Sequence, residues 1–379
     1  MKIVTIIGAR PQIIKAAALS RAIKNHYADS IQEIIVHTGQ HYDENMSEVF
    51  FDELQIPRPD YNLHVGSASH GVQTARMIEG IEEILLKEKP DFIVLYGDTN
   101  STLAGAVAAS KILIPIVHIE AGLRSFDKAM PEEINRIVCD HCSTLLFSPT
   151  KAGYDNLRRE GFPIDNEAPY TIDNPKVFHC GDIMYDNSLY FSSVAAAKTD
   201  IIGRLGLSNN AFVLATIHRN ANTDDPERLS AIFQSIVKIA QETNIVLPLH
   251  PRTAKLLKTN LSEELQQALQ SCGKLKLIEP VSFLEMIELE RNAQLIMTDS
   301  GGVQKESYFF GKPCIILRPE TEWVEIVETG NAILVDADES RIMAAWKHFS
   351  EQHTAAFPPI FGDGHAAEFM LEQMLNLKR

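Results

Sequence analysis

The chain has 379 residues, of which 45% are hydrophobic and 22% charged, a balance typical of globular proteins with more than one domain. Its 35 basic and 50 acidic residues give a net charge of −15, which argues against nucleic acid or an anionic membrane surface as the main partner. No run of about 18 apolar residues is present, and the apolar run at the N-terminus is too short for a signal peptide.

The five cysteines are scattered and odd in number, which favours reduced thiols in a cytosolic enzyme. Cys139 and Cys142 have the spacing of a metal-binding pair, but they stand in helical register and the sequence contains no second pair. We therefore expect no metal site.

The first part of the chain alternates short apolar runs with longer helical segments. Strands are predicted at residues 2–8, 33–39, 92–97, 114–120 and 144–150. Helices are predicted after the first strand, near 43–55, near 70–87, after the third strand, from Pro131 onward and after the fifth strand. Apolar strands that alternate with helices are typical of a parallel sheet covered on both faces.

Residues 160–176 are polar, contain prolines and lack periodicity, so we interpret them as a loop that leads to a domain boundary. The strand pattern then restarts at 212–218, 244–250, 275–279, 295–300, 314–318 and 332–335. We predict two Rossmann-like, doubly wound parallel-sheet domains facing a cleft, at 1–176 and 177–355. The last helix, within 356–379, is expected to pack back onto one of them, and we assign it to the N-terminal domain. Ligands of such sheets bind beyond the carboxyl ends of the strands.

The first strand is followed by Gly8-Ala9-Arg10-Pro11-Gln12 and then by a helix. Arg10 could reach a phosphate, with Lys15 one turn into the helix, although a helix-packing arginine is the alternative. There is no GxGxxG motif and no acidic residue at the end of the second strand, so we do not expect NAD or another cofactor.

Two further motifs in the first domain carry carboxylates. Asp98, in the Gly97–Thr102 segment, could serve as a base or as a helix N-cap. The segment 118–136 gathers Glu120, Glu132 and Arg136 with other charges at a strand end. Such groups suit proton transfer on an anionic substrate, and a charged loop before a helix is the alternative.

The second domain contains Thr298-Asp299-Ser300-Gly301-Gly302, followed by a helix. Glycines and helix N-terminal amides favour a pyrophosphate, and Glu306, one turn further on, could accept hydrogen bonds from ribose hydroxyls. A plain helix cap is the alternative reading of this motif.

Other side chains near strand ends of the second domain are candidates for the same ligand. His218 could touch phosphate or sugar, or be structural. Phe283 and Met286 could wall a base, or pack in the core. The remaining cationic candidates are His250, Arg252 and Arg318.

Taken together, these motifs resemble the non-hydrolysing UDP-N-acetylglucosamine 2-epimerases over nearly the whole chain. The resemblance rests on GARPQIIK, GDTNST, HIEAGLRS with PEEINR, and TDSGGVQKE. It implies a glycosyltransferase-B-like pair of domains, a cytoplasmic homodimer, a UDP-sugar substrate, and neither metal nor NAD.

The reaction that this family implies is inversion at C2, by elimination of UDP to 2-acetamidoglucal and re-addition. By resemblance Asp98, Glu120 and Glu132 are the acid–base residues, Arg136 positions Glu132, and Lys15 helps to hold the sugar or phosphates. The resemblance also implies UDP contacts for Arg10, His218, Ser300, Gly301, Gly302, Glu306 and Arg318, and we group His218 with the catalytic residues.

Two departures, Gln12 and the segment 181–187, resemble the branch that acts on UDP-2,3-diacetamido-2,3-dideoxyglucuronate. The segment 38–47 also departs from the one that helps to form an allosteric substrate site in bacterial members, so the resemblance does not extend to that site. The alternatives are a hydrolysing epimerase, a glycosyltransferase of the same fold, and a nucleotide-sugar binding module without turnover.

Overall fold

A computed structural model describes residues 1–39, 57–209, 211–351 and 356–377. Contacts within the chain divide it into two compact units. Unit 1 comprises Met1–Asn187 together with Pro359–Arg379, and unit 2 comprises Ser188–Pro358.

The sheet of unit 1 has seven strands in the order β3-β2-β1-β4-β5-β6-β7 in the described chain, and every pair is parallel. The strands are β1 (Lys2–Ile7), β2 (Gln32–His37), β3 (Tyr61–Asn62), β4 (Phe92–Tyr96), β5 (Ile116–Ile119), β6 (Leu145–Ser148) and β7 (Lys176–His179). The order reverses between β1 and β4, so the loops after these two strands flank the crevice where doubly wound sheets bind ligands.

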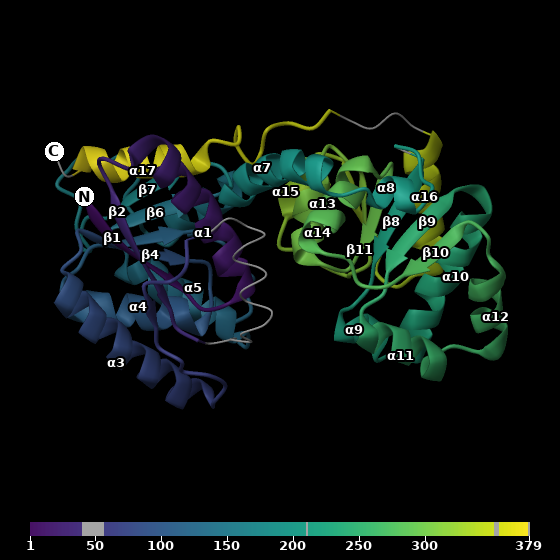
Figure 1. Ribbon diagram of the computed structural model, residues 1–379, viewed down its shortest axis with the longest axis horizontal. Helices are drawn as coiled ribbons and strands as arrows, with labels where there is room; N and C mark the ends of the chain where they lie inside the picture. Colours follow the sequence, from purple (N-terminus) through teal and green to yellow (C-terminus); the bar gives the residue numbers. More distant parts are fainter. Residues whose placement is uncertain (40–56, 210, 352–355, 378–379) are drawn as a thin grey trace. The chain divides into compact units, whose positions relative to one another are not determined.

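Helices cover both faces of this sheet. They are α1 (Arg10–Ala22), which continues as the π-helical turn η1 (Ile23–Tyr27), α3 (His70–Glu88), α4 (Asn100–Lys111), α5 (Pro131–Cys142), α6 (Lys151–Arg159) and α17 (Ala366–Leu377). Figure 1 shows α1 and α17 on one face and α3 and α4 on the other. A Cβ on Gly105 of α4 would lie 2.5 Å from the side chain of Leu95, so this glycine allows α4 to pack closely on β4.

The C-terminal helix belongs to unit 1 because aromatic side chains hold it at the sheet edge. The Phe178 ring of β7 stacks on Phe147 of β6 at 5.1 Å, and the Phe369 ring of α17 meets Phe178 edge-on at 5.8 Å. Since β7 is hydrogen-bonded to β6, the division between the units lies after Asn187, further along than the expected boundary after residue 176. Helix α7 (Ile183–Lys198) runs through this division.

Unit 2 contains a six-stranded parallel sheet in the order β10-β9-β8-β11-β12-β13 in its described residues. Its strands are β8 (Phe212–Thr216), β9 (Asn244–Pro248), β10 (Leu275–Ile278), β11 (Leu295–Thr298), β12 (Cys314–Ile316) and β13 (Ala332–Leu334). Its helices are α8 (Ile201–Arg204), α9 (Asn220–Thr223), α10 (Pro226–Glu242), α11 (Pro251–Asn260), α12 (Glu263–Ser271), α13 (Phe283–Asn292), α14 (Gly301–Phe309), α15 (Val324–Glu328) and α16 (Glu339–Glu351). The order reverses between β8 and β11, which places the loops after these strands at the second crevice.

The prediction of two Rossmann-like, doubly wound parallel sheets is confirmed. The structure adds β3 and β7, two short edge strands that the sequence pattern did not predict because they are too brief for a recognisable period. The helix expected near 43–55 and most of the segment 38–47 lie outside the described residues. None of the helices in the described ranges combines the length and the apolar character that a membrane-crossing segment needs.

Candidate functional site

An ion pair lies beside the turn after β4, at the crevice of unit 1. Glu120, directly after β5, accepts a hydrogen bond from Lys15 of α1, and both side chains are largely buried. A Cβ on Gly97 would crowd this pair, at 3.2 Å from Lys15 Nζ and 3.3 Å from Glu120 Oε2, and Gly97 also has a left-handed φ of 59° that favours glycine. Residues from three segments of the chain therefore meet at the switch point of the sheet.

Glu120 itself has a left-handed backbone conformation, with φ of 76°. This conformation costs a residue other than glycine about 1–3 kcal/mol and persists only where the surroundings impose it. Here the backbone N–H of Glu120 donates to the Phe147 carbonyl at 3.1 Å, and the side chain is held by Lys15. The left-handed backbone conformation thus places the Glu120 carboxylate at the crevice of unit 1.

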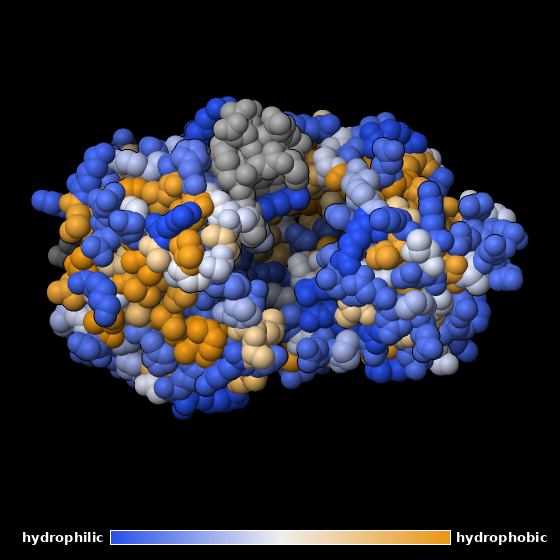
Figure 2. All heavy atoms as spheres, turned by 90° about the horizontal axis from the view of Figure 1, so that it is seen from below, coloured by the Kyte–Doolittle hydropathy of each residue, from blue (hydrophilic) through white to orange (hydrophobic). Residues whose placement is uncertain are grey.

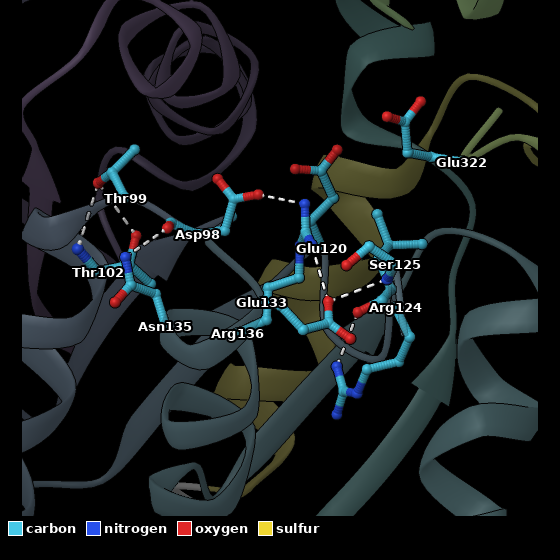
Figure 3. A network of polar contacts seen from close by, with 12 residues as sticks. Asp98, Thr99, Thr102, Glu120, Arg124, Ser125, Glu133, Asn135, Arg136 and Glu322 are labelled. Atoms are coloured by element: carbon cyan, nitrogen blue, oxygen red, sulfur yellow. Dashed lines mark hydrogen bonds and ion pairs between the residues drawn. The ribbon is translucent and has the colours of Figure 1, made fainter. Parts of the chain in front are cut away.

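Arg136 of α5 connects two carboxylates of this site (Figure 3). It forms ion pairs with Asp98 and with Glu133, the latter at 3.1 Å. The buried Glu133 also accepts the backbone N–H groups of Ser125 and Phe126 at 2.9 and 3.0 Å. These two hydrogen bonds hold the Glu133 carboxylate in its buried position, where it pairs with Arg136.

The sequence-based expectation that Arg136 positions Glu132 is therefore wrong in this structure. Glu132 is exposed at the start of α5, and the two ion pairs of Arg136 go to Asp98 and Glu133. The alternative reading of Asp98 as an N-cap is also wrong. The cap of α4 is Thr99, whose hydroxyl accepts the Thr102 N–H at 3.4 Å, which leaves the Asp98 side chain to Arg136.

Beneath these carboxylates lies a buried charge network. His118 on β5 has Nδ1 2.6 Å from Asp140 and Nε2 2.8 Å from the carbonyl oxygen of Gly97, the residue before Asp98. The second oxygen of Asp140 pairs with Arg124 at 2.7 Å and accepts the Gly122 N–H at 3.2 Å. The network thus holds both the turn that carries Asp98 and the loop after Glu120.

The ionisation of this network follows from its contacts. Burial alone would lower the pKa of His118, but the neighbouring Cys139 and Asp140 raise it well above its usual value. Burial likewise opposes the charge of Asp140, and the cations His118 and Arg124 hold the pKa of that carboxyl below its usual range. His118 is therefore an imidazolium that donates from both nitrogens.

Gln12 connects the loop after β1 to the end of β4 by hydrogen bonds. Its buried side-chain oxygen accepts the Gly8 N–H at 2.9 Å, and its nitrogen donates to the Tyr96 carbonyl and the Thr102 hydroxyl, each at 3.0 Å. A carboxylate in its place would have no proton to donate to Tyr96. Arg10, at the start of α1, is exposed.

In unit 2 the N-terminus of α14 lies close to two guanidinium groups. Ser300 caps the helix by accepting the Val303 N–H. A Cβ on Gly301 would lie 3.8 Å from both Arg219 and Arg318 and 3.4 Å from Glu322. Helix amides and two arginines around a glycine form a site for an anion such as a diphosphate.

Glu322 and Asp299 hold this anion site together. Glu322 accepts two hydrogen bonds from Arg318, both at 3.0 Å. Burial raises the pKa of Glu322, but hydrogen bonding, to Arg318 above all, together with the charges of Arg318 and Arg219 outweighs burial and keeps the pKa below its usual value. The buried Asp299 accepts the backbone N–H groups of His218 and Arg219 at 3.1 and 3.0 Å, which fixes the loop after β8.

Arg219 and Asp299 were not among the residues predicted for the site. Asp299 directly follows β11 and Arg219 lies in the loop after β8, and this position near a strand end was the available signal. The Nδ1 atom of the half-exposed His218 lies 3.4 Å from Asp299.

The other residues of unit 2 that were predicted for the site lie against groups of the protein itself. His250 caps α11 by accepting the Arg252 N–H at 3.3 Å, and Arg252 pairs with Asp224 and Asn220 near α9. The Phe283 ring packs edge-on against Phe191 at 5.3 Å. Met286 lies half-buried against the core of unit 2, and Glu306 lies in α14, beyond Gly302.

No ion-binding cluster of three or more His, Cys, Asp and Glu side chains occurs in the ranges that the structure describes. Cys139 and Cys142 are free thiols, as are the other three cysteines of the chain.

The chain is similar to known proteins over nearly its whole length. Residues 22–375 match the family model described as UDP-N-acetylglucosamine 2-epimerase. The chain is 48% identical over 378 residues to a UDP-N-acetylglucosamine 2-epimerase homolog of Methanococcus maripaludis, with 100% of both chains covered. It is 46% identical over 379 residues to UDP-2,3-diacetamido-2,3-dideoxy-D-glucuronate 2-epimerase of Pseudomonas aeruginosa, again with 100% of both covered.

Solved structures are similar over the same length. The UDP-GlcNAc 2-epimerase of Methanocaldococcus jannaschii has a TM-score of 0.85 at 40% identity, covering 99% of this chain and 100% of that one. A complex of that organism's enzyme with UDP-GlcNAc and UDP has a TM-score of 0.80 at 42% identity, with the same coverage.

Proposed function

Because the chain belongs to the UDP-N-acetylglucosamine 2-epimerase family, we propose that it interconverts UDP-GlcNAc and UDP-ManNAc without net hydrolysis. One observation carries the proposal. Two carboxylates with their own cations, Asp98 with Arg136 and Glu120 with Lys15, stand at the switch point of unit 1. Unit 2 supplies the anion site at α14.

In the first stage a carboxylate removes the C2 proton while the C1–O bond breaks and its electron pair leaves with UDP. The C2 hydrogen has no adjacent carbonyl and is not acidic, so departure of UDP must be made easy. Arg219, Arg318 and the α14 amides suit this task because they stabilise charge on a diphosphate. The product of this stage is 2-acetamidoglucal, with a double bond between C1 and C2.

In the second stage the UDP oxygen attacks C1 and C2 receives a proton on the opposite face. Proton removal and return on opposite faces of the sugar require an acid and a base in different positions. Asp98 and Glu120 meet this requirement because a different cation holds each of them, Arg136 and Lys15 respectively. Glu132 remains a third acid–base candidate. We assign contacts with UDP to Arg10, His218, Ser300, Gly301, Gly302, Glu306 and Arg318, and further contacts to His250, Arg252, Phe283 and Met286.

A second substrate, UDP-2,3-diacetamido-2,3-dideoxyglucuronate, is favoured by the 46% identical relative from Pseudomonas aeruginosa. The two sequence departures that suggested this branch are structural. Gln12 is buried among backbone groups, and in the segment 181–187 Asp186 accepts the N–H groups of Ala366 and Ala367 at the start of α17. The side chains of Gln12 and Asp186 are thus accounted for by contacts within the protein.

The deciding experiment offers both UDP-sugars in deuterium oxide and follows each by proton NMR. We expect deuterium at C2 of product and recovered substrate, with free UDP present only transiently. Product without deuterium at C2 would refute the elimination. If UDP accumulates in step with free sugar, the protein is a hydrolysing epimerase. If UDP is released only with an added acceptor, it is a glycosyltransferase. If the nucleotide sugar binds without exchange at C2, it is a binding module without turnover.

We also propose that the protein is a cytoplasmic homodimer. Free thiols suit a reducing compartment. Figure 2 shows hydrophobic residues gathered over α3 and α4 of unit 1, where Leu86 and Leu113 are 54% and 83% exposed. Leu113 also has φ of 60°, an unusual conformation for a large exposed side chain. Exposed apolar patches of this kind mark protein interfaces.

The dimer is tested by analytical ultracentrifugation. We expect Leu113→Asp to produce monomers, whereas the matched variant Leu277→Asp, which changes a 36% exposed leucine of unit 2, leaves the mass unchanged. A monomeric wild-type protein would refute the proposal.

A further inference from the structure

Glu290 is a buried acidic side chain that the proposed chemistry does not use. It lies on α13 and is 0% exposed. Neither of its carboxyl oxygens meets a hydrogen-bond donor among the described residues. An ionised carboxylate without donors is unfavourable in an apolar interior, so burial favours the protonated form of Glu290. The O–H group of that form then needs a hydrogen-bond acceptor.

The neighbour of Glu290 is the carboxyl group of Glu306 on α14, which lies within hydrogen-bonding reach. Two carboxyl groups can form such a bond only when one of them is protonated. Burial, and then the charge of Glu306, raise the pKa of Glu290 well above its usual value. Since Glu290 is the fully buried partner and Glu306 is half-exposed, the shared proton belongs to Glu290.

Glu306 in turn reaches back toward the anion site. Its Oε2 atom lies 4.0 Å from the position that a Cβ on Gly302 would occupy, and the Ser300 hydroxyl lies 3.9 Å from the same position. Side chains on a helix lean toward its N-terminus, so Glu306 directs an acceptor toward a ligand bound at the start of α14.

We propose that Glu290 is a positioning residue, a neutral carboxylic acid that donates a hydrogen bond to Glu306 and thereby orients Glu306 to accept hydrogen bonds from the vicinal hydroxyls of a ribose. This inference rests on the nucleotide site of the proposed function. It makes Glu290 responsible for recognition of the ribose hydroxyls, and not for recognition of the diphosphate or for proton transfer at C2.

The test uses the full chain, two ligands and three variants. UDP and 2′,3′-dideoxy-UDP differ only in the ribose hydroxyls, and isothermal titration calorimetry gives the Kd of each. Glu290→Gln keeps a donor and nearly the same shape, Glu290→Met removes the donor at similar volume, and Glu306→Ala removes the acceptor.

We expect the wild type to prefer UDP over the dideoxy compound by about tenfold, the size of a hydrogen bond to a charged group. Glu290→Met should lose most of this preference while its affinity for the dideoxy compound stays within about twofold, and Glu290→Gln should keep it. The infrared difference spectrum of wild type minus Glu290→Gln at neutral pH should contain the C=O band of a protonated carboxylic acid, because other raised carboxyl groups such as Asp186 cancel in the difference.

Equal weakening of both ligands in Glu290→Met would overturn the inference, because that result indicates a packing role only. A Glu290→Gln variant as impaired as Glu290→Met would also overturn it, as would a difference spectrum without the band. If Glu306→Ala keeps the full preference for UDP, the nucleotide site itself is misassigned and the proposed function fails with the inference. If Glu306→Ala loses the preference and Glu290→Met keeps it, only the role of Glu290 fails.

Discussion

His118 and Asp140 form a buried ion pair, with Nδ1 of His118 2.6 Å from a carboxylate oxygen of Asp140, in the layer directly beneath the candidate catalytic carboxylates. The other nitrogen of His118 holds the Gly97 carbonyl at 2.8 Å, and the other oxygen of Asp140 holds the Gly122 N–H. One pair therefore fixes the turn that carries Asp98 and the loop that follows Glu120.

Breaking this pair should impair both stability and turnover. We expect Asp140→Asn to reduce the free energy of unfolding by about 3–5 kcal/mol, because it leaves charged His118 buried without its carboxylate, whereas Arg124 keeps its ion pair with Glu160. Urea unfolding measures this loss. In the folded protein, kcat should fall while the Kd for UDP, whose binding we propose for unit 2, stays the same. Unchanged kcat per folded molecule would show that the pair does not position the carboxylates.

The docking of α17 should depend on pH through Asp186. Burial raises the pKa of Asp186 to about 7, although the amides of Ala366 and Ala367 oppose the shift. A carboxyl group with a raised pKa contributes stability that is complete below its unfolded pKa, near 4, and is lost as pH rises through about 7. Between these values stability should fall by at most about 1.4 kcal/mol per pH unit.

Asp186→Asn isolates this effect, because the amide keeps an acceptor for the α17 N–H groups and cannot ionise. Urea unfolding at pH 5 and pH 8 should show a smaller difference in the variant than in the wild type, and hydrogen exchange should place the change in α17. The same pH dependence in both proteins would exclude Asp186 as its source.

Glu132 and Glu133 are neighbours whose substitutions should have different consequences. Glu132→Gln changes an exposed side chain, so we expect little loss of stability and, if Glu132 is an acid–base residue, a fall in kcat of about 10²–10⁴-fold. Glu133→Gln removes a buried carboxylate that accepts two backbone N–H groups and pairs with Arg136, so thermal stability should fall. If Glu132→Gln turns over normally, proton transfer belongs to Asp98 and Glu120 alone.

Glu120→Gln should abolish turnover while leaving UDP bound. The substitution removes the carboxylate and its ion pair with Lys15 but keeps the shape of the side chain. We expect kcat to fall by at least about 10²-fold, and deuterium exchange at C2 to disappear in parallel. Calorimetry with UDP is the control. A collapse of UDP affinity with surviving exchange would make Glu120 a binding residue.

Arg219 should bind the diphosphate, although sequence reasoning did not select it. Its guanidinium lies 3.8 Å from the position of a Cβ on Gly301, the same distance as that of Arg318. We expect Arg219→Ala and Arg318→Ala each to weaken UDP by about tenfold, as loss of a charge-assisted hydrogen bond would. Uridine, which has no phosphates, is the matched ligand and should bind these variants as it binds the wild type. Equal weakening of uridine would point to a damaged fold.

The predicted strands were recovered because apolar β-branched runs, helical periodicity and strand-end glycines are local properties of the chain. Two buried residues that the sequence analysis did not select have no such local mark. Asp140 and Glu290 stand in helices among other charges and look like surface positions in the sequence, yet both are 0% exposed. Burial of one helix face depends on what packs against it, which the periodicity of a charged segment does not reveal.

By itself, the sequence determined that the chain forms two doubly wound sheets, and that its carboxylate and glycine motifs follow strands, since these features depend on neighbouring residues. Only the tertiary structure decided which charges meet. Lys15 reaches Glu120, and Arg136 reaches Asp98, because the order β1-β4-β5 brings the ends of these strands side by side. Ion pairing depends on distances of a few ångströms in space, and the fold of the whole sheet sets those distances.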